Sequence, residues 1–126
     1  MPVAIRCRYR AGGAEDRFAI RDLHVEYMMA HRDAVAFGGP TLDGLETTGV
    51  FLLLVTDDVG SARDFMQQEP YCRAGLFGSV DYAVVQAFIP EPHTGFLAEL
   101  HASSQSVAQE LRARTPRPAW LGAFWG

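Results

Sequence analysis

Two short stretches of the chain combine residue types that can move protons. Arg21-Asp22-Leu23-His24 places a histidine in a run with helical spacing, and Glu69-Pro70 places a carboxylate directly before a proline. Imidazole exchanges protons near neutral pH, and a carboxylate partner can hold the ring in one tautomer and favour its protonated form. If the fold brings His24 and Glu69 together, they form a candidate acid–base pair facing a small pocket.

Arginine side chains accompany the histidine. Arg17 and Arg21 lie near the direction of His24 on a helical wheel, roughly one turn earlier. Guanidinium groups in that position can hold an anionic substrate or stabilise a developing oxyanion. Two other interpretations stay open: His24 as a core histidine bonded to backbone, and Glu69 as a solvated residue before a helix-stopping proline.

The other possible ligands and bases form no recognisable motif. His31 follows His24 by two helical turns, roughly 10 Å of rise, so the two rings cannot share one site directly. We interpret His31 as a helix-end residue favoured by the helix dipole. No zinc-ligand spacing connects the remaining candidates, and neither a metal nor another cofactor is expected; these candidates are Cys7, Cys72, His93 and His101.

The first half of the chain predicts strand, helix, strand. Apolar and polar residues alternate over residues 3–10, as in a half-exposed strand that ends at Gly12-Gly13. Residues 14–34 lack Gly and Pro and have helical spacing, which predicts one long helix. Ala36-Phe37 predicts a short strand that runs into a tight loop at Gly38-Gly39-Pro40, followed by turn-like residues 41–48.

The second half of the domain repeats the order. Residues 49–56 predict a strand, Asp57 or Asp58 can cap a helix that runs to about residue 68, and residues 80–89 predict the last strand. The resulting β-α-β-β-α-β order predicts a ferredoxin-like α+β fold, with a four-stranded antiparallel sheet and helices on one face. The two most apolar strands need cover on both faces, which predicts a homodimer that joins two sheets.

The C-terminal region differs from this pattern. We place the boundary at residue 90, with a domain over residues 1–90 and an extension over residues 91–126. An apolar stripe predicts a helix over residues 95–113, which Thr115-Pro116-Arg117-Pro118 ends. We expect the aromatic end of the chain, which contains Trp120 and Trp125, to pack on the domain, at the pocket mouth or on the partner subunit.

Composition excludes several classes of function. The chain has 126 residues and a net charge of −4, and its basic residues are all arginines without a basic cluster, so no nucleic-acid partner is expected. The N-terminus lacks a signal-peptide pattern, and the longest aliphatic run, at residues 50–55, is too short to cross a bilayer. With two isolated cysteines, the chain is typical of a soluble cytoplasmic protein that has no membrane partner.

These pieces together resemble the YCII-related family over about residues 1–90. The shared pattern is Arg21-x-x-His24, then Gly39-Pro40, the apolar strand at residues 49–56, and Glu69-Pro70-Tyr71-x-x-Ala74-Gly75. The resemblance implies a dimeric α/β-barrel in which two sheets pack face to face. It also implies a cleft in each subunit, with His24 and Glu69 as the active-site pair. The family's aspartate is a glutamate here, one methylene longer.

The resemblance also implies a class of reaction. Relatives with the same barrel act on small ring compounds, often without a cofactor. We therefore expect a lyase or isomerase in which His24 removes a proton, Glu69 orients it and Arg21 stabilises the anion. The substrate-binding candidates are Arg17, Tyr27, Gly39, Pro40 and Tyr71. The alternatives are a non-catalytic dimer that binds a small molecule or serves as a scaffold, and a cofactor-free monooxygenase.

Overall fold

The chain divides into two compact units. The computed structural model describes residues 1–114 and 118–124. The first unit is Met1–Gln86 and the second is Ala87–Gly126. The first unit contains the sheet and the helices that position the candidate site.

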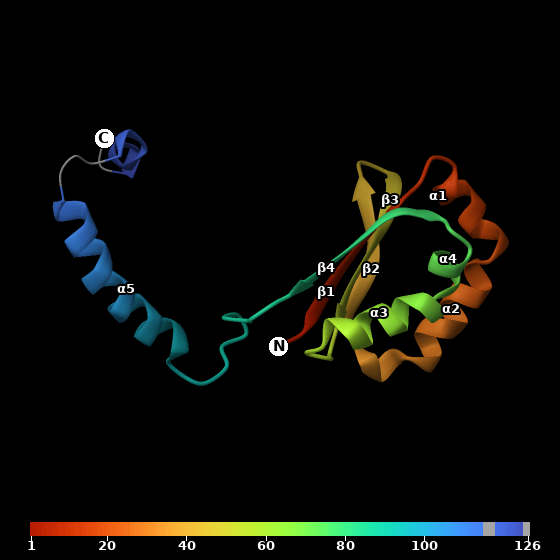
Figure 1. The fold of residues 1–126 in the computed structure, drawn as a ribbon, viewed down its shortest axis with the longest axis horizontal. Helices are drawn as coiled ribbons and strands as arrows, with labels where there is room; N and C mark the ends of the chain where they lie inside the picture. Colours follow the sequence, from red (N-terminus) through yellow and green to blue (C-terminus); the bar gives the residue numbers. More distant parts are fainter. Residues whose placement is uncertain (115–117, 125–126) are drawn as a thin grey trace. The chain divides into compact units, whose positions relative to one another are not determined.

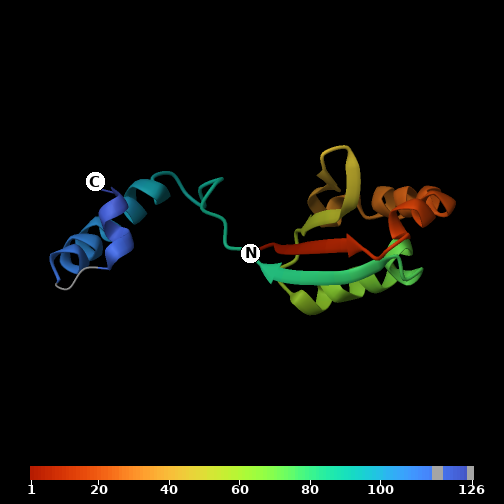
Figure 2. The same ribbon diagram turned by 90° about the horizontal axis from the view of Figure 1, so that it is seen from above.

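The first unit is built on a four-stranded antiparallel sheet. Its strands are β1 (Val3–Tyr9), β2 (Val35–Asp43), β3 (Glu46–Leu54) and β4 (Phe77–Val84), in the spatial order β2-β3-β1-β4. Figure 1 shows the sheet with its helices, and Figure 2 shows β1 and β4 side by side, running in opposite directions. This is the predicted ferredoxin-like α+β arrangement.

The predicted long first helix is wrong, because the chain forms four short pieces instead. These are α1 (Gly13–Asp16), η1 (Arg17–Ala19), α2 (Arg21–Ala30) and η2 (Arg32–Ala34). The backbone leaves helical geometry at Ile20, with φ −133° and ψ 16°, and again beyond the end of α2. The bend lets the Ile20 side chain pack against the core, while its carbonyl accepts the first hydrogen bond of α2.

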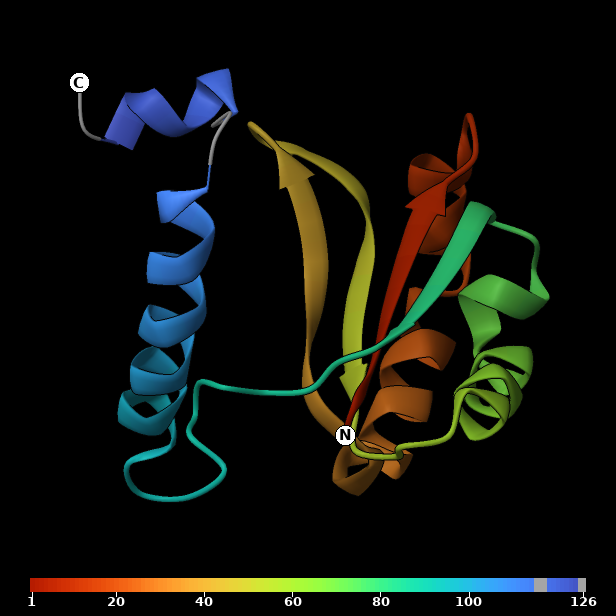
Figure 3. The same cartoon turned by 60° about the vertical axis from the view of Figure 1, so that its left-hand side comes forward.

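The second helical region holds the core in place. Helix α3 (Val59–Gln68) begins at Asp58, whose carboxylate accepts hydrogen bonds from two backbone N–H groups, as predicted for an N-cap. It buries Ala62 and Met66 against the sheet. Helix α2 has no fully buried residue. Figure 3 shows both helices with the sheet. Because α3 contributes buried side chains and α2 contributes none, α3 packs on the core and α2 can line a cavity.

Two strands differ from the sequence-based prediction. Gly38-Gly39-Pro40 lies within β2 rather than in a loop. A proline has no N–H to donate, and β2 tolerates this because it is an edge strand with a neighbour on one side only. The turn comes later, at Gly44, where φ is 59°. The last strand covers Phe77–Val84 rather than residues 80–89, since its pairing with β1 begins at Tyr9 and ends at Val3.

The hydrophobic core lies between α3, α4 (Pro70–Arg73) and one face of the sheet. Alternate residues of β1 and β3 supply most of it, as the period of two in a strand requires. The buried apolar side chains are Val3, Ile5, Cys7, Val50, Leu52, Leu54, Ala62, Met66, Tyr71 and Leu76.

The second unit contains a helix, as the apolar stripe predicts. Helix α5 covers Phe96–Ala113, and a 3₁₀ helix, η3, covers Ala119–Phe124. The predicted helix break at residues 115–117 and the side chain of Trp125 lie outside the described residues. Packing of this unit on the domain or on a partner stays a prediction. Within the described residues, no helix has both the length and the apolar character needed to cross a membrane.

Candidate active site

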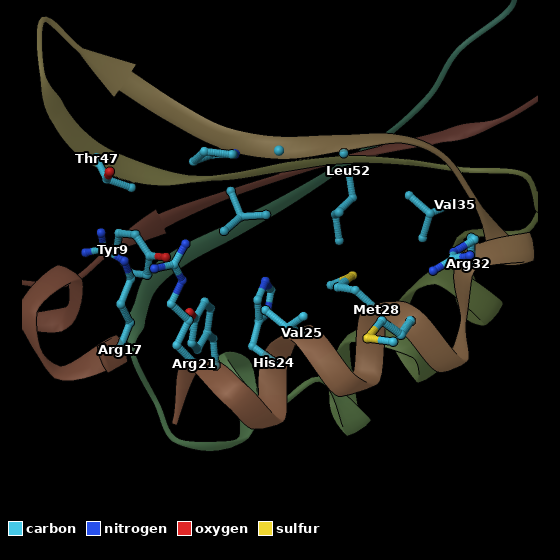
Figure 4. Close-up of a pocket in the computed structure, with 16 residues that line it drawn as sticks. Tyr9, Arg17, Arg21, His24, Val25, Met28, Arg32, Val35, Thr47 and Leu52 are labelled. Atoms are coloured by element: carbon cyan, nitrogen blue, oxygen red, sulfur yellow. The ribbon is translucent and has the colours of Figure 1, made fainter. Parts of the chain in front are cut away.

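A cavity of about 510 Å³ opens between α2 and the strands β2 and β3. Figure 4 shows side chains of α2 pointing across this space toward the sheet. Its volume is in the range of small-molecule sites, and its wall combines apolar side chains with a few charged ones. The lining residues are Tyr9, Arg17, Arg21, His24, Val25, Met28, Met29, Arg32, Val35, Gly38, Gly39, Pro40, Thr47, Val50, Leu52 and Tyr71.

His24 contacts Glu69 directly. The imidazole Nδ1 lies 2.5 Å from Oε1 of the carboxylate. The Glu69 side chain is 1% exposed and the His24 side chain 16% exposed, so the carboxylate is buried and the imidazole reaches the cavity. An ionised carboxylate accepts only, so Nδ1 donates, and the neutral ring then carries its free lone pair on Nε2.

The Glu69 carboxylate is held by the helix that follows it. Glu69 is the N-cap of α4 and Pro70 is the first residue of that helix, where a missing N–H costs nothing. Oε2 accepts a hydrogen bond from the backbone N–H of Cys72 at 2.9 Å. Both oxygens therefore have partners, as burial of a charge requires. One glutamate side chain therefore both caps α4 and contacts His24.

Tyr71 fixes the plane of the imidazole. The two rings stack with centroids 4.0 Å apart and planes 5° apart. Tyr71 is itself 2% exposed and packs edge-on against Tyr9 and Phe77. A rigid aromatic wall on one side and the Glu69 carboxylate on another leave the imidazole little freedom to rotate.

The phenols in the cavity wall stay neutral. Burial raises the pKa of Tyr9 to about 12, and the nearby Tyr71 adds to this effect. Burial also raises the pKa of Tyr71, although Arg17 and Arg21 oppose it. At neutral pH both hydroxyls therefore carry their proton and can donate hydrogen bonds to an anion in the cavity.

The structure brings most of the predicted site residues to this one cavity. Arg17, Arg21, Gly39, Pro40 and Tyr71 all line it together with His24. Tyr27 does not line it: its hydroxyl donates to the carbonyl of Phe65 at 2.7 Å, and its ring packs on His31. Tyr27 therefore joins α2 to α3 and does not reach a ligand in the cavity.

Several lining residues were missed by the sequence analysis. Arg32 follows Arg21 by eleven residues, which is three helical turns within about 20°, so the helical wheel carried a usable signal. Tyr9 and Thr47 come from strands, and only the strand pairing places them at the cavity. No group of three or more His, Cys, Asp or Glu side chains is arranged to hold a metal ion within residues 1–114 and 118–124.

The fold and site define a class of protein: a ferredoxin-like α+β domain with a histidine–carboxylate pair beside a cavity. Residues 1–86 match the YCII-related domain, and the chain belongs to this family. The match ends at Gln86, the last residue of the first compact unit. No curated protein matches the chain.

A solved structure shares the fold. It is 5-chloro-2-hydroxyhydroquinone dehydrochlorinase from Burkholderia phenoliruptrix in complex with 2,5-dihydroxybenzoquinone. The TM-score is 0.62 and the sequence identity 24%, and the match covers 68% of this chain and 94% of the other. At this identity the comparison establishes the fold.

Proposed function

We propose that the protein is a cofactor-independent acid–base enzyme of the lyase or isomerase type, acting on a small ring compound. The observation that carries the proposal is the 2.5 Å contact between buried Glu69 and His24 beside the cavity. A buried carboxylate bonded to one imidazole nitrogen leaves the other nitrogen available as a base. The dehydrochlorinase with the same fold, whose name states elimination from a chlorinated ring, supports this class of reaction.

The proposed first step is removal of a proton from a ring carbon next to a carbonyl. Nε2 of His24 takes the proton, and the electron pair of the C–H bond moves toward the carbonyl oxygen to form an enolate. Glu69 keeps Nδ1 protonated and stabilises the imidazolium that results. In a lyase the enolate then expels a leaving group; in an isomerase the imidazolium returns the proton to another carbon of the ring.

Positive charge near His24 suits the developing oxyanion. Arg17 and Arg21 line the cavity on the same side as His24, and both act electrostatically on Tyr71, which stacks on the imidazole. The neutral phenols of Tyr9 and Tyr71 add hydrogen-bond donors. We assign Arg21 to oxyanion stabilisation and Arg17 to substrate binding.

The test is proton exchange and turnover with a panel of small rings. The panel contains hydroxylated and chlorinated quinones, hydroquinones and unsaturated ring lactones, incubated in D₂O. NMR follows deuterium uptake, and absorbance and chloride release follow product formation. With any compound that reacts, His24→Gln is expected to lower the rate by about 10²–10⁴-fold while changing affinity only a few-fold.

Arg73→Gln is the control for this variant. Arg73 is exposed and does not line the cavity, so its substitution should leave rate and affinity unchanged. A reaction that runs at the wild-type rate in His24→Gln would contradict the proposal. The non-catalytic binding role would be favoured by a different result: the wild type turns over no compound of the panel, and His24→Gln only weakens the binding of these compounds.

We also propose that the protein works as a cytoplasmic homodimer joined through the outer face of the sheet. Phe37, Phe51 and Leu53 lie on this face, opposite the core; Phe37 is 63% exposed, and its ring lies 6.1 Å from that of Phe51. Exposed apolar area of this kind favours association. Both Cys7 and Cys72 are free thiols, which suits a reducing compartment.

A further inference from the structure

Arginine side chains stand at both ends of the cavity. Figure 4 shows Arg17 and Arg21 at one end and Arg32 at the other, with His24 and Met28 between them. Arg21 begins α2 and Arg32 begins η2 just beyond its end, and the ten residues of α2 span roughly 15 Å of helix axis. The site therefore presents positive charge at two separated points along α2 and η2.

Among the described residues, no carboxylate pairs with these charges. None of the described residues that line the cavity is a carboxylate, and the buried Glu69 is engaged with His24 and with the N–H of Cys72. Within the part of the chain that the structure describes, none of the three arginines forms a salt bridge. Arg17 donates to a neutral carbonyl, that of Ala14, and its guanidinium lies over the rings of Tyr9 and Phe18. In a chain with a net charge of −4, this is a local concentration of positive charge.

The wall between the two ends is apolar. Val25 and Met29 project from α2 and are 45% and 61% exposed, although a helix beside a filled core would bury such side chains. Leu52 and Val35 face them from the sheet side, as Figure 4 shows for the labelled residues. A ligand that covered these side chains would gain the favourable free energy of their burial.

We infer that the substrate is an elongated dianion. Its ring lies at His24, its first acidic group lies at Arg21, and a second acidic group on a side chain reaches Arg32. This deepens the proposed function, on which it rests for the choice of the His24 end as the reacting end. The cavity volume of about 510 Å³ is far larger than a bare six-membered ring, so a single-ring monoanion would leave the Arg32 end empty. Guanidinium groups bind carboxylates through paired hydrogen bonds, which makes Arg32 a specificity-determining residue.

The test compares three probes by isothermal titration calorimetry on the full chain at low ionic strength. Benzoate is a monoanion, terephthalate a short dianion and 3-(4-carboxyphenyl)propionate a longer dianion. We expect the longer dianion to bind about tenfold or more tightly than benzoate. Arg32→Gln should remove this advantage and leave the benzoate affinity unchanged, whereas Arg21→Gln should weaken all three probes.

Arg73→Gln is the matched control, because it removes the same charge from the same unit at an exposed site outside the cavity. Thermal melts of all variants show whether each is folded. Equal affinity for benzoate and the longer dianion would overturn the inference. The inference would also be overturned if Arg32→Gln lowered the affinity for all three probes equally, or if Arg73→Gln caused the same loss of affinity.

The outcome is separable from that of the catalytic proposal. Calorimetry measures affinity alone, and His24→Gln in the exchange assay measures turnover alone. A protein that prefers the longer dianion through Arg32 but shows no dependence on His24 would retain this inference and lose the proposed reaction. A protein whose turnover depends on His24 but whose probe affinities do not depend on Arg32 would retain the proposed reaction and lose this inference.

Discussion

At the scale of single residues, Glu69 links a helix end to the candidate base. One carboxylate caps α4 through Oε2 and contacts His24 through Oε1. Capping residues are usually shorter, and this glutamate makes both contacts with one carboxylate. The orientation of the imidazole therefore depends on the local structure of the turn between α3 and α4.

Replacing this carboxylate with an amide should impair the proposed base more than it impairs the fold. In Glu69→Gln the amide oxygen can still accept from the N–H of Cys72 while the NH₂ group faces Nδ1, which favours the tautomer protonated on Nε2. We expect turnover to fall by about 10²–10⁴-fold, as is typical for a wrong tautomer. Rate measurement together with ¹⁵N NMR of the His24 ring checks this.

The control is Glu69→Asp, which keeps the negative charge and shortens the side chain by one methylene. It should preserve the Nδ1-protonated tautomer to a greater extent than the amide does. An amide variant that keeps both the wild-type rate and the wild-type tautomer would show that Glu69 is a structural cap only.

At the scale of elements, the sheet places tight steric limits on particular glycines. Gly49 in β3 faces the backbone of Cys7 in β1: a Cβ atom there would lie 1.8 Å from the carbonyl oxygen of Cys7. Gly39 in the edge strand β2 has open space where its Cβ would be. Both residues belong to strands of the same sheet, so they form a matched pair.

Gly49→Ala should therefore lower the free energy of unfolding strongly, by about 3 kcal/mol or more, because strands β1 and β3 must separate to admit the methyl group. Gly39→Ala should change it by roughly 0.5 kcal/mol or less. Urea denaturation followed by circular dichroism measures both values. Similar values for the two variants would mean that the close approach of β1 and β3 is not as described.

At the scale of the whole molecule, we predict that the outer face of the sheet binds a second copy of the chain. The chain has a mass of 13.9 kDa, and sedimentation velocity at micromolar concentration should report about twice that mass if two sheets pack together. Leu53→Glu places a charge on this face and should convert the protein to a monomer without unfolding it.

Leu45→Glu is the control for assembly, since Leu45 is fully exposed in the turn between β2 and β3. It should leave the sedimentation coefficient unchanged. A wild-type protein that sediments as a monomer would contradict the predicted dimer. Another segment of the chain or another partner would then have to cover the outer face.

Much of the fold follows from local pattern. Alternation in β1, the unbroken apolar run in β3 and the cap at Asp58 each predict their element, because strand period and helix capping are properties of neighbouring residues. The interruption of the first helix at Ile20 was missed, since no Gly or Pro marks it. The placement of Gly38-Gly39-Pro40 in a strand was missed because only an edge position tolerates it.

The sequence by itself determined the order of elements, the family and the two residues of the candidate pair, His24 and Glu69. Each of these can be recognised from short motifs of neighbouring residues. Only the tertiary structure decided that Glu69 meets His24 across 45 residues of chain, that Tyr71 stacks on the imidazole and that Tyr27 turns away to Phe65. It also decided that Arg32 and strand residues such as Tyr9 border one cavity. The physical reason is that contacts between distant segments depend on strand register and helix bends, which core packing selects and no local pattern encodes.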